Sequence, residues 1–218
     1  MKGLAEHTAK VFERISKMET IKPYILVGGT ALSIQIGTRL SEDLDFMKWK
    51  TTRNEKSEVA WYEIKKEMES IGTIDSIDIL DFDMVEFVFE GVKISFYSAP
   101  RIKPRNLKEI EYHNNLRLAD ISSICTMKLE VMMRRNTFRD YYDIYSILKE
   151  GIDVHTVINN AIVHSEFKLK EKNLLMILSN AERFKKDIKF KNLAPQYDVS
   201  AQEIQDFIIS LIKEKNET

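Results

Sequence analysis

The sequence lacks several features that would assign it to a special class of protein. It has a single cysteine, Cys125, which excludes an intrachain disulfide and favours a reducing, cytoplasmic location. It has no apolar run of about 18 residues, so we expect no membrane span. Residues 1–18 carry charges throughout, so we expect no signal peptide. The histidines are scattered without metal-ligand spacing, which argues against a zinc site.

An excess of charge of one sign is also missing. The chain has 33 Lys and Arg against 34 Asp and Glu, for a net charge of −1. No global attraction to nucleic acid follows, and any RNA contact must come from local basic patches. The 218 residues are 44% hydrophobic and 31% charged. These values are typical of a globular protein with one compact domain or two small ones.

The most informative part of the sequence begins with a strand, a glycine pair and a helix. Residues 24–27 predict a buried strand, Gly28 and Gly29 a turn, and Thr30 the start of a short helix. Glycines let the backbone approach a phosphate closely, and the N–H groups that open a helix favour negative charge. A glycine pair in this setting is most often a plain tight turn, so this half of the motif is weak by itself.

Two aspartates follow on a second predicted strand. Strand side chains alternate between faces, so Asp43 and Asp45 share one face while Leu44 and Phe46 share the other. Paired carboxylates suit Mg²⁺, a hard cation that prefers oxygen ligands. Such a pair at a solvated strand end more often consists of exposed surface residues that bind no metal. It becomes more specific here because Leu44 and Phe46 anchor the acids to a core strand.

The two halves together resemble the motif of the AbiEii/AbiGii-type nucleotidyltransferases, within the DNA polymerase beta-like nucleotidyltransferase superfamily. That motif is GG[ST] followed by an R-x-S-x-D approach and a D-x-D pair. The matching residues are Gly28, Gly29, Thr30, Arg39, Ser41, Asp43 and Asp45. The resemblance implies that the two aspartates hold Mg²⁺ or Mn²⁺. It also implies that the glycines, Thr30, Arg39 and Ser41 bind the nucleotide.

A third acid often accompanies the D-x-D pair in this superfamily, on the neighbouring strand. Residues 76–80, 84–89 and 92–97 are rich in β-forming residues, and Glu90 with Gly91 predicts a hairpin turn. The natural position for the third acid, near Ser95, has no carboxylate. Asp83, Glu86 or Glu90 could substitute, and the spacing alone does not choose among them.

Two basic stretches interrupt the predicted elements. Residues 48–56 predict an exposed loop, and residues 100–108 a proline-bearing connector. Each could bind phosphates, although such stretches are more often solvated segments. The connector predicts a domain boundary, with a nucleotidyltransferase-like domain over 1–104 and a helical domain over 105–218. The expected fold is α+β: a mixed sheet flanked by helices, then a helical bundle that includes helices near 154–163, 172–186 and 201–213.

A lysine lies on the apolar face of a helix predicted over residues 120–135. On a helical wheel, Lys128 falls within a stripe that includes Ile124, Cys125 and Met132. A cation on an apolar face is costly unless it meets an anion or reaches solvent. Two interpretations stay open: Lys128 pairs with a buried structural carboxylate, or it points at the nucleotide phosphates. The resemblance supports the second, because the family has a lysine at the start of such a helix.

The next predicted helix, residues 138–149, carries the family's [KR]-D-x-x-D-[IL]-Y signature as Arg139, Asp140, Asp143, Ile144 and Tyr145. The resemblance implies that one of the two aspartates completes the active-site cleft together with Lys128. We favour Asp143 over Asp140. This aspartate would either orient Lys128 or deprotonate the acceptor.

The function implied by the resemblance is Mg²⁺-dependent transfer of an NMP from an NTP to an acceptor hydroxyl. Related toxins modify the acceptor end of tRNA, so an RNA acceptor, tRNA first, is expected. The setting would be a bacterial toxin–antitoxin or phage-defence system, with a cognate antitoxin as a further partner. Two alternatives stay open. One is a catalytically degenerate module that binds nucleotide or RNA, which the missing acid near Ser95 favours. The other is transfer of an NMP to a protein hydroxyl.

Overall fold

The structure is a computed structural model that describes residues 2–185 and 187–214. The chain divides into two compact units, Met1–Asp120 and Ile121–Thr218. Within the described residues, no helix combines the length and the apolar character needed to cross a bilayer.

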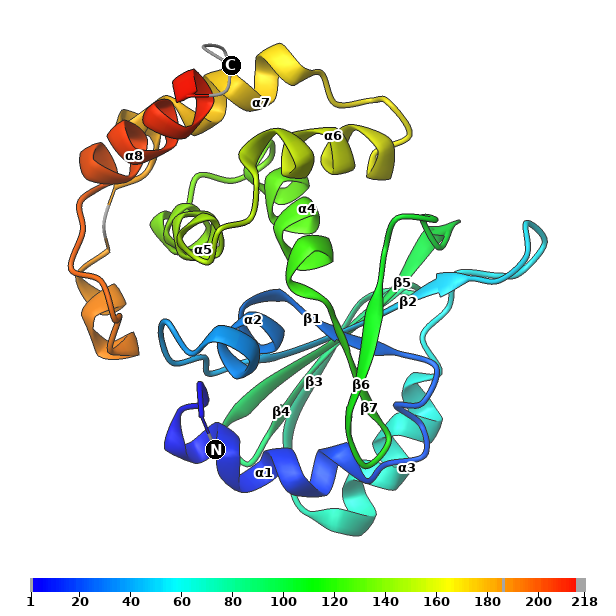
Figure 1. Cartoon of the computed structure of the whole chain (residues 1–218). Helices are drawn as coiled ribbons and strands as arrows, with labels where there is room; N and C mark the ends of the chain where they lie inside the picture. The colour runs from blue at the N-terminus through cyan, green and yellow to red at the C-terminus, as the bar shows by residue number, and fades with distance from the viewer. Residues whose placement is uncertain (1, 186, 215–218) are drawn as a thin grey trace. The chain divides into compact units, whose positions relative to one another are not determined.

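The first unit is built on a mixed sheet, to which its described residues contribute seven strands (Figure 1). The strands are β1 (Ile25–Val27), β2 (Leu44–Lys50), β3 (Ile74–Asp81), β4 (Met84–Phe89), β5 (Val92–Ile102), β6 (Glu109–His113) and β7 (Leu116–Ala119). Their order across the sheet is β3-β4-β5-β2-β1-β7-β6. Strand β2 is parallel to β5 and β1 is parallel to β7, while the other neighbours are antiparallel.

One face of this sheet is an aromatic core. Phe96 on β5 stacks on Phe46 of β2 with ring centroids 5.1 Å apart, and it meets Phe87 of β4 edge-on at 5.9 Å. Helices α1 (Glu6–Ser16) and α3 (Trp61–Ile71) run below the sheet in Figure 1. Arg14 of α1 lies over the Phe89 ring of β4, which places α1 on the aromatic face. The remaining helix of this unit is α2 (Gly28–Ile36).

The second unit is helical throughout its described residues. Its helices are α4 (Ile121–Met132), α5 (Phe138–Lys149), α6 (Val154–His164), α7 (Glu171–Leu178) and α8 (Ala201–Glu214), with 3₁₀ segments η1 (Ala181–Arg183) and η2 (Ile188–Leu193). Helix α5 is its buried centre, because every residue from Asp140 to Leu148 is buried, whichever side of the helix it lies on. Tyr141 stacks on Phe184, and Tyr142 packs edge-on against Phe190.

The expected fold class is confirmed: a mixed sheet with helices is followed by a helical unit. The division between the units lies after Asp120 rather than after residue 104. The basic connector precedes two further strands, β6 and β7, and β7 pairs with β1 in the middle of the sheet. These strands therefore belong to the first unit.

Two local predictions were wrong. Residues 48–50 are not loop but the end of β2, where Trp49 is buried and pairs in register with Ala99 of β5. The helix expected over 172–186 ends at Leu178, before Ser179 and Asn180. Serine and asparagine compete for backbone hydrogen bonds and are poor helix formers. Lys186, the last residue of that expected helix, lies outside the described residues.

Candidate active site

The glycine pair forms the junction between β1 and α2, and the helix begins at Gly28 rather than at Thr30. Gly28 has φ +69°, a conformation that residues with a β-carbon rarely adopt. A β-carbon there would lie 2.8 Å from Oδ2 of Asp45. At Gly29 a β-carbon would lie 2.4 Å from Nη2 of Arg39. The glycines therefore leave room for two charged side chains of the chain itself, one at each position.

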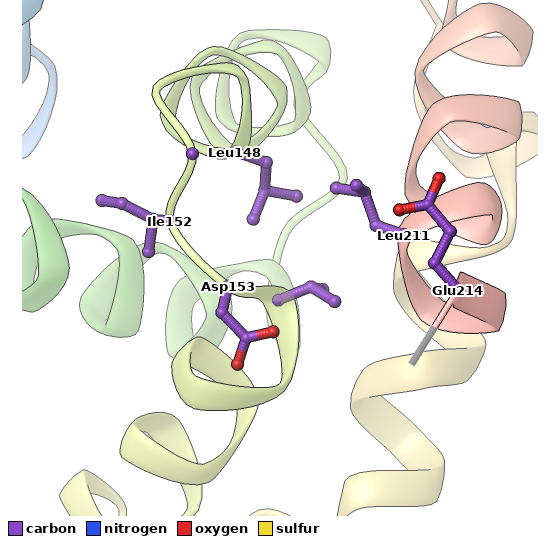
Figure 2. A pocket seen from close by; sticks show the side chains of 7 residues that line it. Leu148, Ile152, Asp153, Leu211 and Glu214 are labelled. Atoms are coloured by element: carbon purple, nitrogen blue, oxygen red, sulfur yellow. The ribbon is translucent and has the colours of Figure 1, made fainter. Parts of the chain in front are cut away.

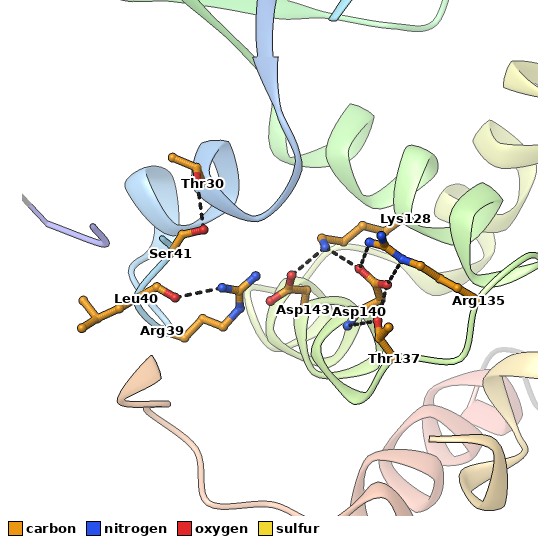
Figure 3. Close-up of polar contacts among 9 residues, drawn as sticks. All are labelled: Thr30, Arg39, Leu40, Ser41, Lys128, Arg135, Thr137, Asp140 and Asp143. Carbon is orange, nitrogen blue, oxygen red and sulfur yellow. Dashed lines mark hydrogen bonds and ion pairs between the residues drawn. The ribbon is translucent and has the colours of Figure 1, made fainter. Parts of the chain in front are cut away.

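Hydroxyl groups fix the loop that leads to the aspartates. The Thr30 hydroxyl donates to the backbone carbonyl of Asp43, and it is hydrogen-bonded to the Ser41 hydroxyl at 2.8 Å (Figure 3). The backbone of Ser41 is held from the other side by Gly3 and Ala5. Both hydroxyls are buried. They hold the segment that presents Asp43, which is a positioning role.

Arg39 is buried beside this loop. Its Nη1 donates to the Leu40 carbonyl at 2.8 Å, and its exposed fraction is 2% (Figure 3). A buried guanidinium keeps its charge, so Arg39 contributes a fixed positive charge close to Gly29. The family resemblance gave Arg39 only as a nucleotide-binding residue, whereas its burial and its place beside Gly29 come from the tertiary structure.

Asp43 and Asp45 lie at the beginning of β2, the strand that the sequence predicted after the glycine motif. Asp43 immediately precedes the strand, and Asp45 is its second residue. Both are partly exposed, while Leu44 and Phe46 between and after them are buried. The Asp43 carboxylate makes no hydrogen bond or short ion pair with a described residue. Its oxygens are therefore free to bind a cation.

The register of the sheet separates the three candidates for the third acid. Ser95 of β5 lies opposite Asp45 on one side and opposite Glu86 of β4 on the other. Glu86 is thus on the same face as Asp45, one strand further away. Glu90 is engaged elsewhere, because both of its carboxylate oxygens bind the Arg14 guanidinium. Asp83 lies in the turn between β3 and β4. Strand register is a long-range property, so spacing in the sequence could not make this choice.

Lys128 of α4 is held between two buried aspartates of α5. Its Nζ lies 2.6 Å from Oδ2 of Asp143 and 3.0 Å from Oδ1 of Asp140 (Figure 3). The three side chains are at most 7% exposed. A cation on an apolar helix face is tolerated here because it meets two anions. Lys128 therefore makes the contact that the first interpretation expected, and it makes it with both aspartates.

Asp140 is the more heavily engaged of the two aspartates. Besides Lys128, it accepts from Nε of Arg135 at 2.8 Å, from Nη2 of Arg135 at 3.1 Å and from the Thr137 hydroxyl. Burial raises the pKa of Asp140, but the nearby Lys128 and Arg135 charges and these hydrogen bonds outweigh it and hold the pKa well below its ordinary value. The Asp140 carboxylate is therefore ionised and fixed in place. The Arg135 and Thr137 contacts were missed by the sequence reasoning.

The second unit also contains a hollow of about 380 Å³ at the ends of α5 and α8 (Figure 2). Its lining is Leu148, Gly151, Ile152, Asp153, Val154, Leu211 and Glu214. Asp153 caps α6 by accepting from the Thr156 backbone N–H at 2.9 Å. None of the motif residues lines this hollow, so it contributes nothing to the candidate active site.

Comparison with known proteins assigns the motif to a family. The sequence profile described as "Nucleotidyl transferase AbiEii toxin, Type IV TA system" matches residues 10–213. The chain belongs to the AbiEii family. As an AbiEii protein it is a nucleotidyltransferase and a toxin of a type IV toxin–antitoxin system. The match extends through both units, so the helical unit is part of the family pattern as well.

The chain is also similar to two individual proteins. An uncharacterized protein of Aquifex aeolicus (strain VF5), aq_aa25, is 22% identical over 220 residues, which cover 98% of each chain. The structure resembles that of MenT4, a nucleotidyltransferase toxin from Mycobacterium tuberculosis H37Rv, with a TM-score of 0.55 and 14% identity. The alignment covers 97% of this chain and 86% of MenT4. At this identity the likeness shows a shared fold.

Proposed function

We propose that this AbiEii protein transfers an NMP from an NTP to an acceptor hydroxyl of RNA, with Mg²⁺ or Mn²⁺ bound at Asp43 and Asp45. The observation that carries the proposal is the start of β2. Asp45 on the strand and Asp43 directly before it are partly exposed carboxylates, beside the start of α2 and the buried charge of Arg39.

The carboxylates of Asp43 and Asp45 fit a divalent cation. Mg²⁺ is typically bound by one or two carboxylates and completes its coordination with water and substrate phosphates. Two aspartates at the beginning of β2, one of them without a hydrogen-bond partner among the described residues, match that donor set. The nucleotidyltransferase superfamily generally uses divalent metals. When bound, such an ion neutralises phosphate charge and lowers the pKa of the acceptor hydroxyl.

In the proposed reaction, the acceptor oxygen forms a bond to the α-phosphorus of the NTP. The bond from that phosphorus to the bridging oxygen breaks, pyrophosphate leaves with the bonding electrons, and the acceptor proton passes to solvent. Gly28, Gly29 and Thr30 form the corner at which we place the β- and γ-phosphates, because the first N–H groups of a helix favour anions. Arg39 adds positive charge at this corner, and Ser41 with Thr30 holds the loop in place.

Lys128 is proposed to offset the charge that develops on the leaving pyrophosphate. Its contacts with Asp140 and Asp143 support the view that the aspartates orient the ammonium group, rather than acting as bases. Asp140 already accepts hydrogen bonds from Lys128, Arg135 and Thr137. Asp143 is fully buried and lies 2.6 Å from the ammonium. We therefore propose Asp140 and Asp143 as positioning residues for Lys128.

Basic residues at the carboxyl ends of β2 and β5 support an RNA acceptor. These strands are parallel, with Lys48 opposite Ser98 and Lys50 opposite Ile102, so their carboxyl ends lie at the same edge of the sheet. The two basic stretches, residues 48–56 and 100–108, begin in the last residues of these strands and continue beyond them, so they leave the sheet at the same edge. A local concentration of Lys and Arg attracts the phosphate backbone of nucleic acid even when the whole protein is nearly neutral. The 3′ end of tRNA is the acceptor we would test first.

The test is a labelling assay with each of the four α-³²P NTPs, Mg²⁺ and either total tRNA or a tRNA-free protein fraction. We expect label on tRNA from at least one NTP and none when Asp43→Asn replaces the wild-type chain. Label on protein alone would show that the acceptor is a protein hydroxyl rather than RNA. Absence of label from both fractions with every NTP would contradict the proposal and favour a degenerate binding module. The antitoxin, which the family implies as a partner, is left out of the assay so that it cannot suppress activity.

A further inference from the structure

A row of polar side chains crosses the sheet beside the paired aspartates. Asp45 of β2 lies opposite Ser95 of β5, which in turn lies opposite Glu86 of β4. Residues directly opposite each other on neighbouring strands present their side chains on the same face. Strand β5 therefore lies between the carboxylates of Asp45 and Glu86, and at this position it carries the hydroxyl group of Ser95.

A lysine lies next to this row. Lys93 is two residues before Ser95 on β5, and so it is on the same face. Its Nζ lies 2.7 Å from Oε1 of Glu86, and that oxygen is 3.5 Å from the Ser95 hydroxyl. The hydrogen bond that Lys93 donates to Glu86 raises the pKa of Lys93 most, while burial lowers it. The charges of Asp43 and Asp45 raise it further, so the ammonium lies within the field of both proposed metal ligands.

This arrangement limits the number of divalent ions that the sheet can hold. Two-ion phosphoryl-transfer sites place one ion at the attacking oxygen and one at the leaving group, and each ion needs carboxylate ligands. Here a neutral hydroxyl stands opposite Asp45. Among the described residues, no three Asp, Glu, His or Cys side chains come together to hold a metal. The two aspartates of β2 suffice for one ion.

We propose that the Lys93 ammonium, held by Glu86, takes the place of the second divalent ion. This proposal deepens the proposed function and rests on it. In it the chain binds one divalent ion at Asp43 and Asp45. Lys93 donates a hydrogen bond to the attacking acceptor oxygen and stabilises the negative charge that develops there. Glu86 is the positioning residue that keeps the ammonium beside the acids. The Lys93 side chain is 46% exposed, so a substrate can reach it.

The first test counts bound ions without turnover. The full chain is titrated with Mn²⁺, and free Mn²⁺ is followed by electron paramagnetic resonance. We expect one Mn²⁺ per wild-type chain. The double variant Lys93→Ala, Ser95→Asp introduces a third carboxylate opposite Asp45 and removes the competing cation. We expect this variant to bind two Mn²⁺ per chain. Two ions on the wild type, or one on the double variant, would overturn the proposal.

The second test measures transfer by single variants. Lys93→Ala is expected to lower the transfer rate about 100-fold, the scale of losing one preorganised charge-stabilising group. The matched control is Lys65→Ala, which removes a lysine of similar exposure whose partner is Glu69 on α3. It should transfer at the wild-type rate. Equal rates for the two variants would overturn the proposal.

The role of Glu86 is tested by Glu86→Gln. We expect the transfer rate to fall about 10-fold, with Mn²⁺ affinity within about threefold of wild type, because a positioning residue is not a ligand. A loss of Mn²⁺ affinity greater than about tenfold would make Glu86 a metal ligand and overturn the assignment. If the wild-type chain transfers no nucleotide, the proposed function fails. The Mn²⁺ count still decides the one-ion proposal in that case.

Discussion

The two groups of charged motif residues differ in how their charges are balanced. Asp43 and Asp45 on β2 are partly exposed, and Asp43 has no hydrogen-bonding or ion-pair partner among the described residues. Lys128 and its two aspartates are buried, and the two negative charges are balanced by Lys128 together with Arg135, which also binds Asp140. An exposed carboxylate can be replaced with little effect on folding, whereas a buried ion pair leaves an uncompensated charge when one partner is removed. We therefore expect mutation of Asp43 or Asp45 to change metal binding and the transfer rate but not stability, whereas mutation of Lys128, Asp140 or Asp143 should change stability as well as the rate.

The largest effect on stability is expected from Lys128→Ala. It leaves Asp140 and Asp143 buried without their shared cation, which should cost about 3–5 kcal/mol of unfolding free energy. Urea unfolding followed by circular dichroism measures the loss. Lys128→Arg, which keeps the positive charge, is the control and should be much less destabilised. A stability of Lys128→Ala within about 1 kcal/mol of wild type would show that the buried pairing matters little.

Asp140→Asn should also lower the stability, by an amount that depends on pH. The pKa of Asp140 is lowered in the folded protein from its ordinary value of 3.8, so its ionised form stabilises the fold. That contribution is complete above pH 3.8 and is lost as the pH falls through the lowered folded pKa. We expect the variant to be about 3 kcal/mol less stable at pH 7, with the gap narrowing below pH 3.8. A gap that stays constant down to pH 2 would contradict this assignment.

Asp43→Asn should show the opposite behaviour. We expect the transfer rate to fall at least about 100-fold, because the variant loses a proposed metal ligand. The free energy of unfolding should change by less than about 0.5 kcal/mol, as for other partly exposed positions. Rate and urea unfolding are measured on the same preparation. A variant that transfers at the wild-type rate would rule out Asp43 as a metal ligand.

Gly28→Ala tests the junction that supports Asp45. The alanine must adopt φ +69°, and its β-carbon would lie 2.8 Å from the Asp45 carboxylate. We expect a loss of about 1–2 kcal/mol in unfolding free energy, together with weaker Mn²⁺ binding as Asp45 is displaced. Gly91→Ala is a useful comparison, because it has a similarly positive φ with nothing within 4 Å of its β-carbon. It should be destabilised without any change in Mn²⁺ affinity.

The sequence predicted local features better than those set by long-range pairing. Helix α5 has the predicted bounds, Phe138–Lys149, because its apolar positions recur with helical spacing. The hairpin at Glu90 and Gly91 is confirmed, with both residues at positive φ. Strands β6 and β7 were missed. They are short, and β7 is fixed by parallel pairing with the distant β1, which local spacing does not report.

The same limit applies to the candidate site. Asp43 and Asp45 were placed on one strand face by alternation, and the buried position of Lys128 by its helical stripe. The choice among the acids near Ser95 needed the register of three strands. The Arg135 and Thr137 contacts that fix Asp140 depend on how α5 begins. The sequence did contain a signal for the Thr137 contact, because a threonine directly before a helix is a common N-cap.

The most direct test of the account is a double-mutant cycle between Asp43 and Lys128, which are proposed to act in one transfer reaction. The transfer rates of Asp43→Asn, Lys128→Arg and the double variant are compared with wild type, after urea unfolding shows that each is folded. If both residues act in the same step, we predict that the double variant is about as slow as the slower single variant, since groups that act as a unit are not additive. Losses that multiply in full would contradict the claim that the two residues act together.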